Sequence, residues 1–449
     1  MSSDAQPSYG PAYMPADVPG PLARALVERD GRVMAPMGRA YPLVVDHAVG
    51  CEVWDVDGHR YLDLSAGVAV LAAGHCHPRL VAVAQAQLAR FTHMAGTDFY
   101  NEPMIKAAEK LVALMPGGDG WQVFFTNSGT ESIEASLKLA RYVTGRQNII
   151  GFYGAFHGRS YGSLSLTASK PRQRQGFFPL LPGTFHSYYP NCYRCPINLT
   201  HPTCAIACLD LIERTLFSTT TPASEVAAIV VEPIQGEGGY VVPPFGALRK
   251  LRALCDRHGI MLICDEVQSG VGRTGKMWAF DHEGIVPDIV ASAKGLGGGL
   301  PIGAMIARAE LARQWESGAH SNTYGGNGLT CAVTHELLCL VEAELMDNAA
   351  TVGTHLLGRL QALQPRFAQI GAVRGRGLMI GVELIDPASG APDHDLAQAV
   401  MTEAFRKGLL VLTCGASTIR FCPPLILTCE QADEAVGRFA LTLEACLAC

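Results

Sequence analysis

The chain is short of charged residues, of basic clusters and of long apolar runs. Of its 449 residues, 17% are charged, against about 25% in ordinary globular proteins. Its net charge is −6 and no dense run of Lys or Arg occurs, so we expect no nucleic-acid partner. Its apolar runs, such as 67–74, fall far short of the ~20 residues that span a membrane. Residues 1–20 lack the basic and apolar segments of a secretory signal, so we expect a cytoplasmic location and no membrane partner.

Glycine, cysteine and apolar side chains are what the chain has in excess. Its 48 glycines exceed the ~31 that ordinary usage gives, which predicts many tight turns or close backbone contacts. Hydrophobic residues make up 48%, enough for a large core, and the length predicts about two to three domains. The 15 cysteines are odd in number and come without a secretory signal, so we expect mostly reduced thiols.

From about residue 121 onward, short apolar runs alternate with helical patterns. In 131–142, Ile133, Leu137 and Ala140 recur at helical spacing. The short runs carry consecutive rather than alternating apolar residues, as strands buried on both faces do. This pattern predicts an α/β fold with a mostly parallel sheet, whose strands we expect at 122–125, 148–153, 227–231, 260–264, 288–291 and 304–306.

The pattern of apolar residues changes after about residue 330, which predicts a second, smaller α+β domain. Long helical stretches there are followed by strand candidates at 381–384, 410–412 and 418–421. Near the other end, Trp54 to Gly58 predicts a strand followed by an Asp-Gly turn. We therefore expect residues 1–74 to form an N-terminal arm and part of the small domain, 75–330 the large domain, and 331–449 the C-terminal small domain.

Polar residues follow the predicted strands at their carboxyl ends, where an open α/β sheet binds its ligands. Ser128-Gly129-Thr130 opens a helix, so its free N–H groups and the helix dipole suit a phosphate; a simple N-cap is the alternative. Lys294 closes an apolar strand, and a lysine desolvated there can form a Schiff base with a carbonyl. Asp265 also ends an apolar strand, and a buried carboxylate requires a cationic partner such as a protonated pyridine nitrogen.

A phosphate site, a Schiff-base lysine and an aspartate facing a pyridinium are the needs of pyridoxal 5'-phosphate. From about Val44 to its C-terminus, the sequence resembles class III aminotransferases, which are fold-type-I enzymes that use this cofactor. Within this class it resembles 4-aminobutyrate, ornithine and acetylornithine aminotransferases. The motifs that carry the resemblance are Gly74-His75-Cys76-His77-Pro78, Asn127 to Glu131, Ala155-Phe156-His157-Gly158-Arg159, Glu232 to Gly239, Asp265 to Gly275, Ala293-Lys294-Gly295, Thr323 to Asn327, and Arg374 to Leu378.

The resemblance implies a cofactor role for each matching residue of the large domain. Lys294 would hold the cofactor and shuttle a proton, Asp265 would keep the ring nitrogen protonated, and Gln268 would bind the phenolic oxygen. Phe156 and Val267 would face the two sides of the ring. The cofactor-binding set implied in this way is Ser128, Gly129, Thr130, Phe156, His157, Glu232, Asp265, Val267, Gln268, Lys294 and Thr323.

Thr323 would reach the phosphate from the neighbouring subunit, so the resemblance implies a homodimer with shared active sites. Two such dimers could pair into a tetramer, which the sequence does not decide. No metal is expected at this site. A cluster outside the site, Cys192, Cys195, Cys204 and Cys208, could hold a structural metal or a disulfide, but reduced loop thiols are the default expectation.

Substrate residues also follow from the resemblance. Arg420 resembles the arginine that binds a substrate carboxylate, a task suited to its planar guanidinium, and Glu232 matches the glutamate that neutralises this arginine in one half-reaction. Arg159 matches the arginine that binds the distal carboxylate in 4-aminobutyrate enzymes. Val68 stands where eukaryotic ornithine aminotransferases typically carry a tyrosine, which favours the 4-aminobutyrate type.

The expected activity is transfer of an amino group from an ω-amino or α-amino acid to 2-oxoglutarate by a ping-pong mechanism. The partners would therefore be a small amino acid and a 2-oxo acid. An alternative is an amino-acid racemase or epimerase, because segments such as 151–169 and 419–425 also resemble a microbial subgroup with that activity. Racemisation needs a second acid opposite Lys294, and the sequence does not place one.

Overall fold

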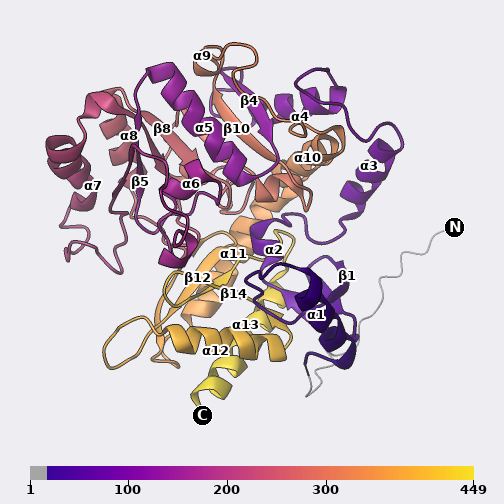
Figure 1. Ribbon diagram of the computed structural model, residues 1–449. Coiled ribbons are helices and arrows are strands. Elements are labelled where there is room, and N and C mark those ends of the chain that lie inside the picture. Colours follow the sequence, from indigo (N-terminus) through magenta and orange to yellow (C-terminus); the bar gives the residue numbers. More distant parts are fainter. Residues whose placement is uncertain (1–17, 449) are drawn as a thin grey trace.

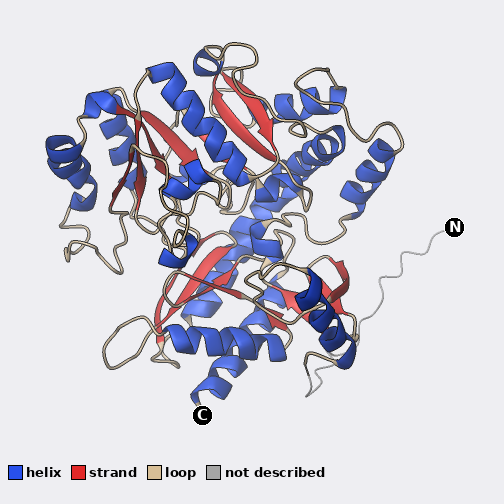
Figure 2. Ribbon diagram, viewed as in Figure 1, coloured by secondary structure: helices blue, strands red, loops and turns tan. Residues whose placement is uncertain are grey.

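A computed structural model describes residues 18–448. Residues 1–17, the larger part of the predicted N-terminal arm, lie outside the described residues. Figures 1 and 2 show two lobes, a larger one around a long twisted sheet and a smaller one in which early and late segments of the described chain, such as α1 and α13, lie together. The predicted domain limits at residues 74 and 330 remain predictions.

The large lobe contains a sheet of seven strands in the order β4-β10-β9-β8-β7-β5-β6. Strand β10 runs antiparallel to both of its neighbours, and the pairs from β9 through β6 are parallel. The strands are β4 (Trp121–Thr126), β5 (Asn148–Phe152), β6 (Thr184–Ser187), β7 (Val226–Val231), β8 (Met261–Asp265), β9 (Ile289–Ser292) and β10 (Gly303–Arg308). All six residues of β7 are buried, as its unbroken apolar run requires.

Helices cover both faces of this sheet. Alternate strand residues face two separate apolar clusters, one shared with α5 (Gly129–Thr144) and the other with α8 (Ala247–His258). Around these helices lie α3 (Pro78–Leu88), α4 (Glu102–Ala113), α6 (Tyr161–Leu166), α7 (Ala207–Leu211), α9 (Ala309–Ala312) and α10 (Gly328–Leu340). Because both faces are covered, the open end of the sheet is where a ligand can enter.

The small lobe contains two sheets of four strands. One joins β1 (Val45–Val49), β2 (Glu52–Asp55) and β3 (Arg60–Asp63) to β13 (Leu409–Leu410), so residues from the two ends of the chain share a sheet. The other has the order β11 (Ile370–Arg376), β12 (Met379–Leu384), β15 (Thr418–Phe421), β14 (Leu412–Cys414). The helices α1 (Pro21–Val33), α2 (Ala66–Ala69), α11 (Met346–Gln361), α12 (His394–Arg406) and α13 (Cys429–Leu447) complete the lobes.

The predicted α/β fold is confirmed, and each of the six predicted strands of the large sheet matches a strand within two residues. The sequence missed β6, a four-residue edge strand in which three residues are only half-buried. It also gave no sign that β10 is antiparallel. Among residues 18–448, no helix is long and apolar enough to cross a membrane.

Candidate active site

The carboxyl ends of β4, β7, β8 and β9 meet around a cavity of about 460 Å³. Most of the predicted site residues line it, although they come from segments up to 166 positions apart in the sequence. These are Ser128, Gly129, Thr130, Phe156, His157, Arg159, Glu232, Asp265, Val267, Gln268 and Lys294.

One end of the cavity is the N-terminus of α5. Ser128 is the N-cap, and its hydroxyl accepts a hydrogen bond from Glu131 N at 3.4 Å. The Thr130 hydroxyl is hydrogen-bonded to the hydroxyls of Ser160 and Ser163, so the backbone N–H groups of Gly129 and Thr130 are what is left for an anion. A Cβ on Gly129 would lie 2.7 Å from Val267 Cγ1, which is why this turn requires glycine.

Lys294 follows β9 and has a backbone φ of +46°, a strained conformation for a residue with a side chain. Burial lowers the pKa of its amine, although Asp265 and Glu237 act in the opposite direction. A lowered pKa raises the fraction of neutral amine, which is the form that attacks a carbonyl and accepts a proton. The lysine is therefore poised for covalent chemistry.

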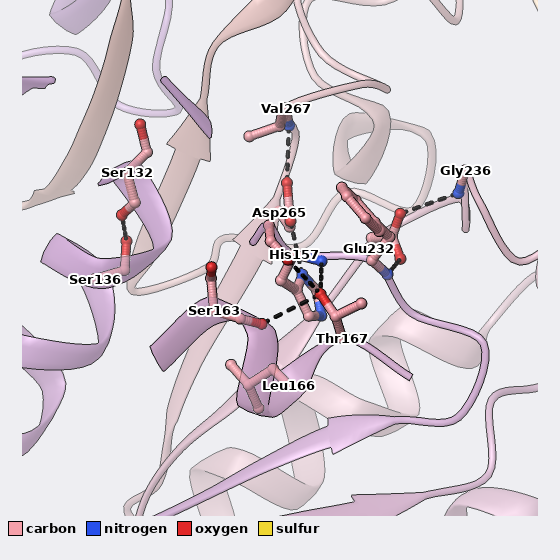
Figure 3. Close-up of polar contacts among 12 residues, drawn as sticks. Ser132, Ser136, His157, Ser163, Leu166, Thr167, Glu232, Gly236, Asp265 and Val267 are labelled. Atoms are coloured by element: carbon pink, nitrogen blue, oxygen red, sulfur yellow. Dashed lines mark hydrogen bonds and ion pairs between the residues drawn. The ribbon is translucent and has the colours of Figure 1, made fainter. Parts of the chain in front are cut away.

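Asp265 lies at the end of β8 and is 4% exposed. Val267 N donates to Asp265 Oδ1 at 3.0 Å, and His157 Nδ1 lies 2.7 Å from Oδ2 (Figure 3). Burial acts to lower the pKa of His157, but the hydrogen bond and charge of Asp265 outweigh it and the pKa is raised. His157 is thus a second support for the carboxylate as well as part of the cavity wall.

Gln268 lines the cavity one turn beyond Asp265. The hydroxyl of Tyr240 donates to Gln268 Oε1 at 2.7 Å, which fixes the amide and leaves its NH₂ group as the donor for a ligand. The sequence did not single out Tyr240. Its place in the strand-like hairpin that pairs Gln235 with Val241 depends on the fold rather than on any motif.

Glu232 does not pair with Arg420, and this prediction is wrong. The two oxygens of Glu232 accept the backbone N–H groups of Phe156 and Gly236, each at 3.0 Å (Figure 3). Burial raises the pKa of Glu232 to about 7. Arg420 Nη1 instead lies 2.5 Å from Glu237 Oε1, because Glu237 occupies the turn of the 235–241 hairpin while Glu232 directly follows β7.

A second hollow of about 860 Å³ contains this Arg420–Glu237 pair, and Val68 and Lys170 also line it. Both members of the pair lie within electrostatic reach of Lys294, so this hollow lies close to the lysine. Val68 belongs to α2, where its φ is +67°. Glu237 lies within the motif 232–239, but this motif contains two glutamates, and the sequence alone does not show which of them pairs with Arg420.

Arg159 and Thr323 are exposed, unlike most of the other predicted site residues. Arg159 is exposed at the rim of the cavity, and its guanidinium carbon lies 5.5 Å from the centre of the Phe156 ring. Thr323 is exposed and lines another hollow together with His320, away from Lys294. The predicted contribution of Thr323 to a neighbouring subunit stays a prediction.

The four clustered cysteines line one small cavity between residues 190 and 244. Every cysteine within residues 18–448 is free of disulfide bonds. The same residues contain no group of three or more His, Cys, Asp or Glu side chains arranged to hold a metal ion.

The residues of the cavity fit pyridoxal 5'-phosphate. Unpartnered helix N–H groups suit its phosphate, a carboxylate fixed by two contacts suits its ring nitrogen, and a lysine of lowered pKa suits its carbonyl. Fold and site together define a pyridoxal phosphate-dependent transferase of fold type I.

The chain belongs to the class-III aminotransferases, whose family model matches residues 33–443. It is 42% identical to an acetylornithine aminotransferase of Methanopyrus kandleri, over 90% of this chain and 95% of that protein. It is 35% identical to an isoleucine 2-epimerase of Lentilactobacillus buchneri, over 92% and 93%. Among solved structures, it resembles a thermostable (S)-enantioselective omega-transaminase from Thermomicrobium roseum with a TM-score of 0.88 and 33% identity, over 95% of this chain and 99% of that one.

Proposed function

We propose that this aminotransferase moves an amino group from an ω-amino or α-amino acid of the 4-aminobutyrate type to 2-oxoglutarate. The observation that carries the proposal is the Arg420–Glu237 pair beside Lys294. A ping-pong transaminase with an ω-amino donor handles one substrate with an α-carboxylate beside the reacting carbon and one without. Arg420 binds the α-carboxylate in the first case, and Glu237 neutralises Arg420 in the second.

The side chains divide the work of the reaction. Bound pyridoxal phosphate would supply the electron sink that stabilises negative charge at the substrate carbon that bears the amino group. Lys294 Nζ takes a proton from that carbon and later returns a proton on the same side. Asp265, held by His157 and Val267 N, keeps a positive charge on the ring nitrogen, and Gln268 donates to the phenolic oxygen.

Arg159 is proposed to bind the distal carboxylate of the donor. It lies at the cavity rim close to Phe156, where it faces the end of a substrate whose amino group reaches Lys294. In the part of the chain that the structure describes, no carboxylate forms an ion pair with Arg159, so its charge is open to a ligand. The proposal also includes a homodimer in which Thr323 completes the phosphate site of the neighbouring subunit, in the cytoplasm.

Racemisation is the competing activity, and the placement of acids around Lys294 favours transamination. Racemisation needs an acid that returns a proton to Cα from the face opposite Lys294. Glu237 is the candidate in the hollow that contains Arg420, because Glu232 uses both of its oxygens to hold the backbone N–H groups of Phe156 and Gly236. Burial acts to raise its pKa, but Arg420 and Lys170 outweigh burial and lower it, so Glu237 is held as a carboxylate that has no proton to give.

The test is incubation of the holoenzyme with single amino acids, with and without 2-oxoglutarate. We expect glutamate in amounts equal to the carbonyl product, and only when 2-oxoglutarate is present. Arg159→Met should raise KM for 4-aminobutyrate about tenfold and leave alanine, which has no distal carboxylate, within about twofold. Loss of optical rotation without 2-oxoglutarate would contradict the proposal in favour of racemisation.

A further inference from the structure

Glu237 faces two cations, one on each of its carboxylate oxygens. Oε1 lies 2.5 Å from Arg420 Nη1, and Oε2 lies 4.0 Å from Lys170 Nζ. The side chains of Arg420, Glu237 and Lys170 are 7%, 18% and 22% exposed, so the three charges sit together where water screens them only in part. Lys170 comes from the segment between α6 and the short helical turn Pro171–Gln173, and nothing in the proposed reaction so far uses it.

We propose that Lys170 is a positioning residue that receives the Glu237 carboxylate whenever a substrate α-carboxylate takes Arg420. The inference rests on the proposed function, because it assigns a second position to the glutamate that alternates between the two substrates.

The physical reason is the fate of Glu237 once Arg420 is occupied. Without a second cation nearby, a partly buried carboxylate that loses its ion-pair partner would bear a desolvation cost that nothing offsets. Because Oε2 already points toward Lys170 Nζ, a small side-chain rotation exchanges the weak contact at 4.0 Å for a close ion pair. The carboxylate then leaves Arg420 without becoming unpaired, and the energy of substrate binding is not consumed in displacing it.

The local charges single out Lys170 for this task. Lys294 also lies within electrostatic reach of Glu237, but burial lowers the pKa of its amine, and the proposed reaction needs that amine neutral so that it can accept a proton. Arg172 lines the same hollow and is exposed, and within residues 18–448 it forms no ion pair with Glu237. Arg172 is therefore a matched control: it is a cation of the same hollow and the same loop that lacks the contact.

The experiment follows each half-reaction separately by the absorbance of the bound cofactor. In Lys170→Met, kcat/KM for 2-oxoglutarate should fall about tenfold through KM, while the half-reaction with the ω-amino donor stays within about twofold. Lys170→Arg should recover most of the loss, and Arg172→Met should change neither half-reaction. Calorimetric binding of 2-oxoglutarate to the holoenzyme gives the same comparison without turnover, with Kd about tenfold weaker in Lys170→Met.

A double variant separates action through Glu237 from direct contact with substrate. In a Glu237→Gln background the neutral amide needs no cation, so adding Lys170→Met should change 2-oxoglutarate binding by less than about twofold. A full tenfold effect in that background, an equal loss in both half-reactions, or no loss at all would overturn the inference. If the wild-type enzyme binds 2-oxoglutarate but forms no glutamate, the proposed function fails, and the binding comparison still decides the role of Lys170.

Discussion

Glu237→Gln tests whether this glutamate, rather than Glu232, neutralises Arg420. The change keeps the shape of the side chain and removes its charge. Arg420 is 6% exposed; burial works to lower its pKa, but Glu237 and, to a smaller extent, Tyr240, Cys414 and Cys422 together raise it. Removing one partner of a buried ion pair costs about 3–5 kcal/mol. Because Glu237 is 18% exposed and the pair borders the hollow, we expect a smaller cost than that range, about 2 kcal/mol, which is about 30-fold in a rate or binding constant.

The loss should fall on one half-reaction only. An ω-amino donor covers Arg420 without pairing it, so kcat/KM for the donor should fall about 30-fold in Glu237→Gln. The substrate glutamate pairs Arg420 with its own α-carboxylate. In the variant it does not have to displace a charged side chain at position 237, so kcat/KM for glutamate should be unchanged or raised. Glu232→Gln is the control: it loosens the turn that holds Phe156 and should weaken both half-reactions alike. A selective loss in Glu232→Gln, with none in Glu237→Gln, would refute this assignment.

Three further predictions concern the cofactor and the buried acids. Lys294→Ala should abolish activity and the visible absorbance of the bound cofactor; a retained spectrum would mean that another lysine carries it. Gly129→Ala forces its Cβ against Val267, 2.7 Å away, and should weaken cofactor retention on dialysis about tenfold or more; Val267→Ala in the same chain should restore part of it. Burial raises the pKa of Glu266 from 4.5 to about 7, so its contribution to stability is full below about pH 4.5 and is lost as the pH rises to 7, about 3 kcal/mol in all. Glu266→Gln should therefore raise the urea midpoint at pH 8 and leave it nearly unchanged at pH 4.5, and an equal shift at both pH values would contradict the burial argument.

Much of the large lobe could be predicted because its strands are unbroken apolar runs. The run that forms β7 has no polar residue and is buried throughout. A short, wholly apolar segment of this kind is expected in the centre of a sheet. Strand β6 escaped prediction because Thr184 to His186 are only half-buried, and a short edge strand needs no apolar pattern. The antiparallel direction of β10 depends on how the chain returns between β9 and β4, which no local run of residues encodes.

Most of the residues that line the cavity could also be predicted, since they stand at the end of a strand or the start of a helix that has its own sequence signature. The pairing of Arg420 could not. Glu232 and Glu237 lie five residues apart, and only the hairpin that brings Gln235 against Val241 decides which of them faces the arginine. Tyr240 and Lys170 went unnoticed for the same reason, because their partners are distant in sequence and no spacing rule connects them.

A single-turnover experiment tests the central claim, that the cavity around Lys294 transfers an amino group. The holoenzyme is mixed with an ω-amino donor alone, and the cofactor absorbance, the carbonyl product and the optical rotation are recorded together. We predict one carbonyl product per site, a bleached cofactor band, and recovery of the band with one equivalent of glutamate when 2-oxoglutarate is added. A band that stays unbleached with every donor tried, or an α-amino acid that loses optical rotation without any carbonyl product, would contradict it.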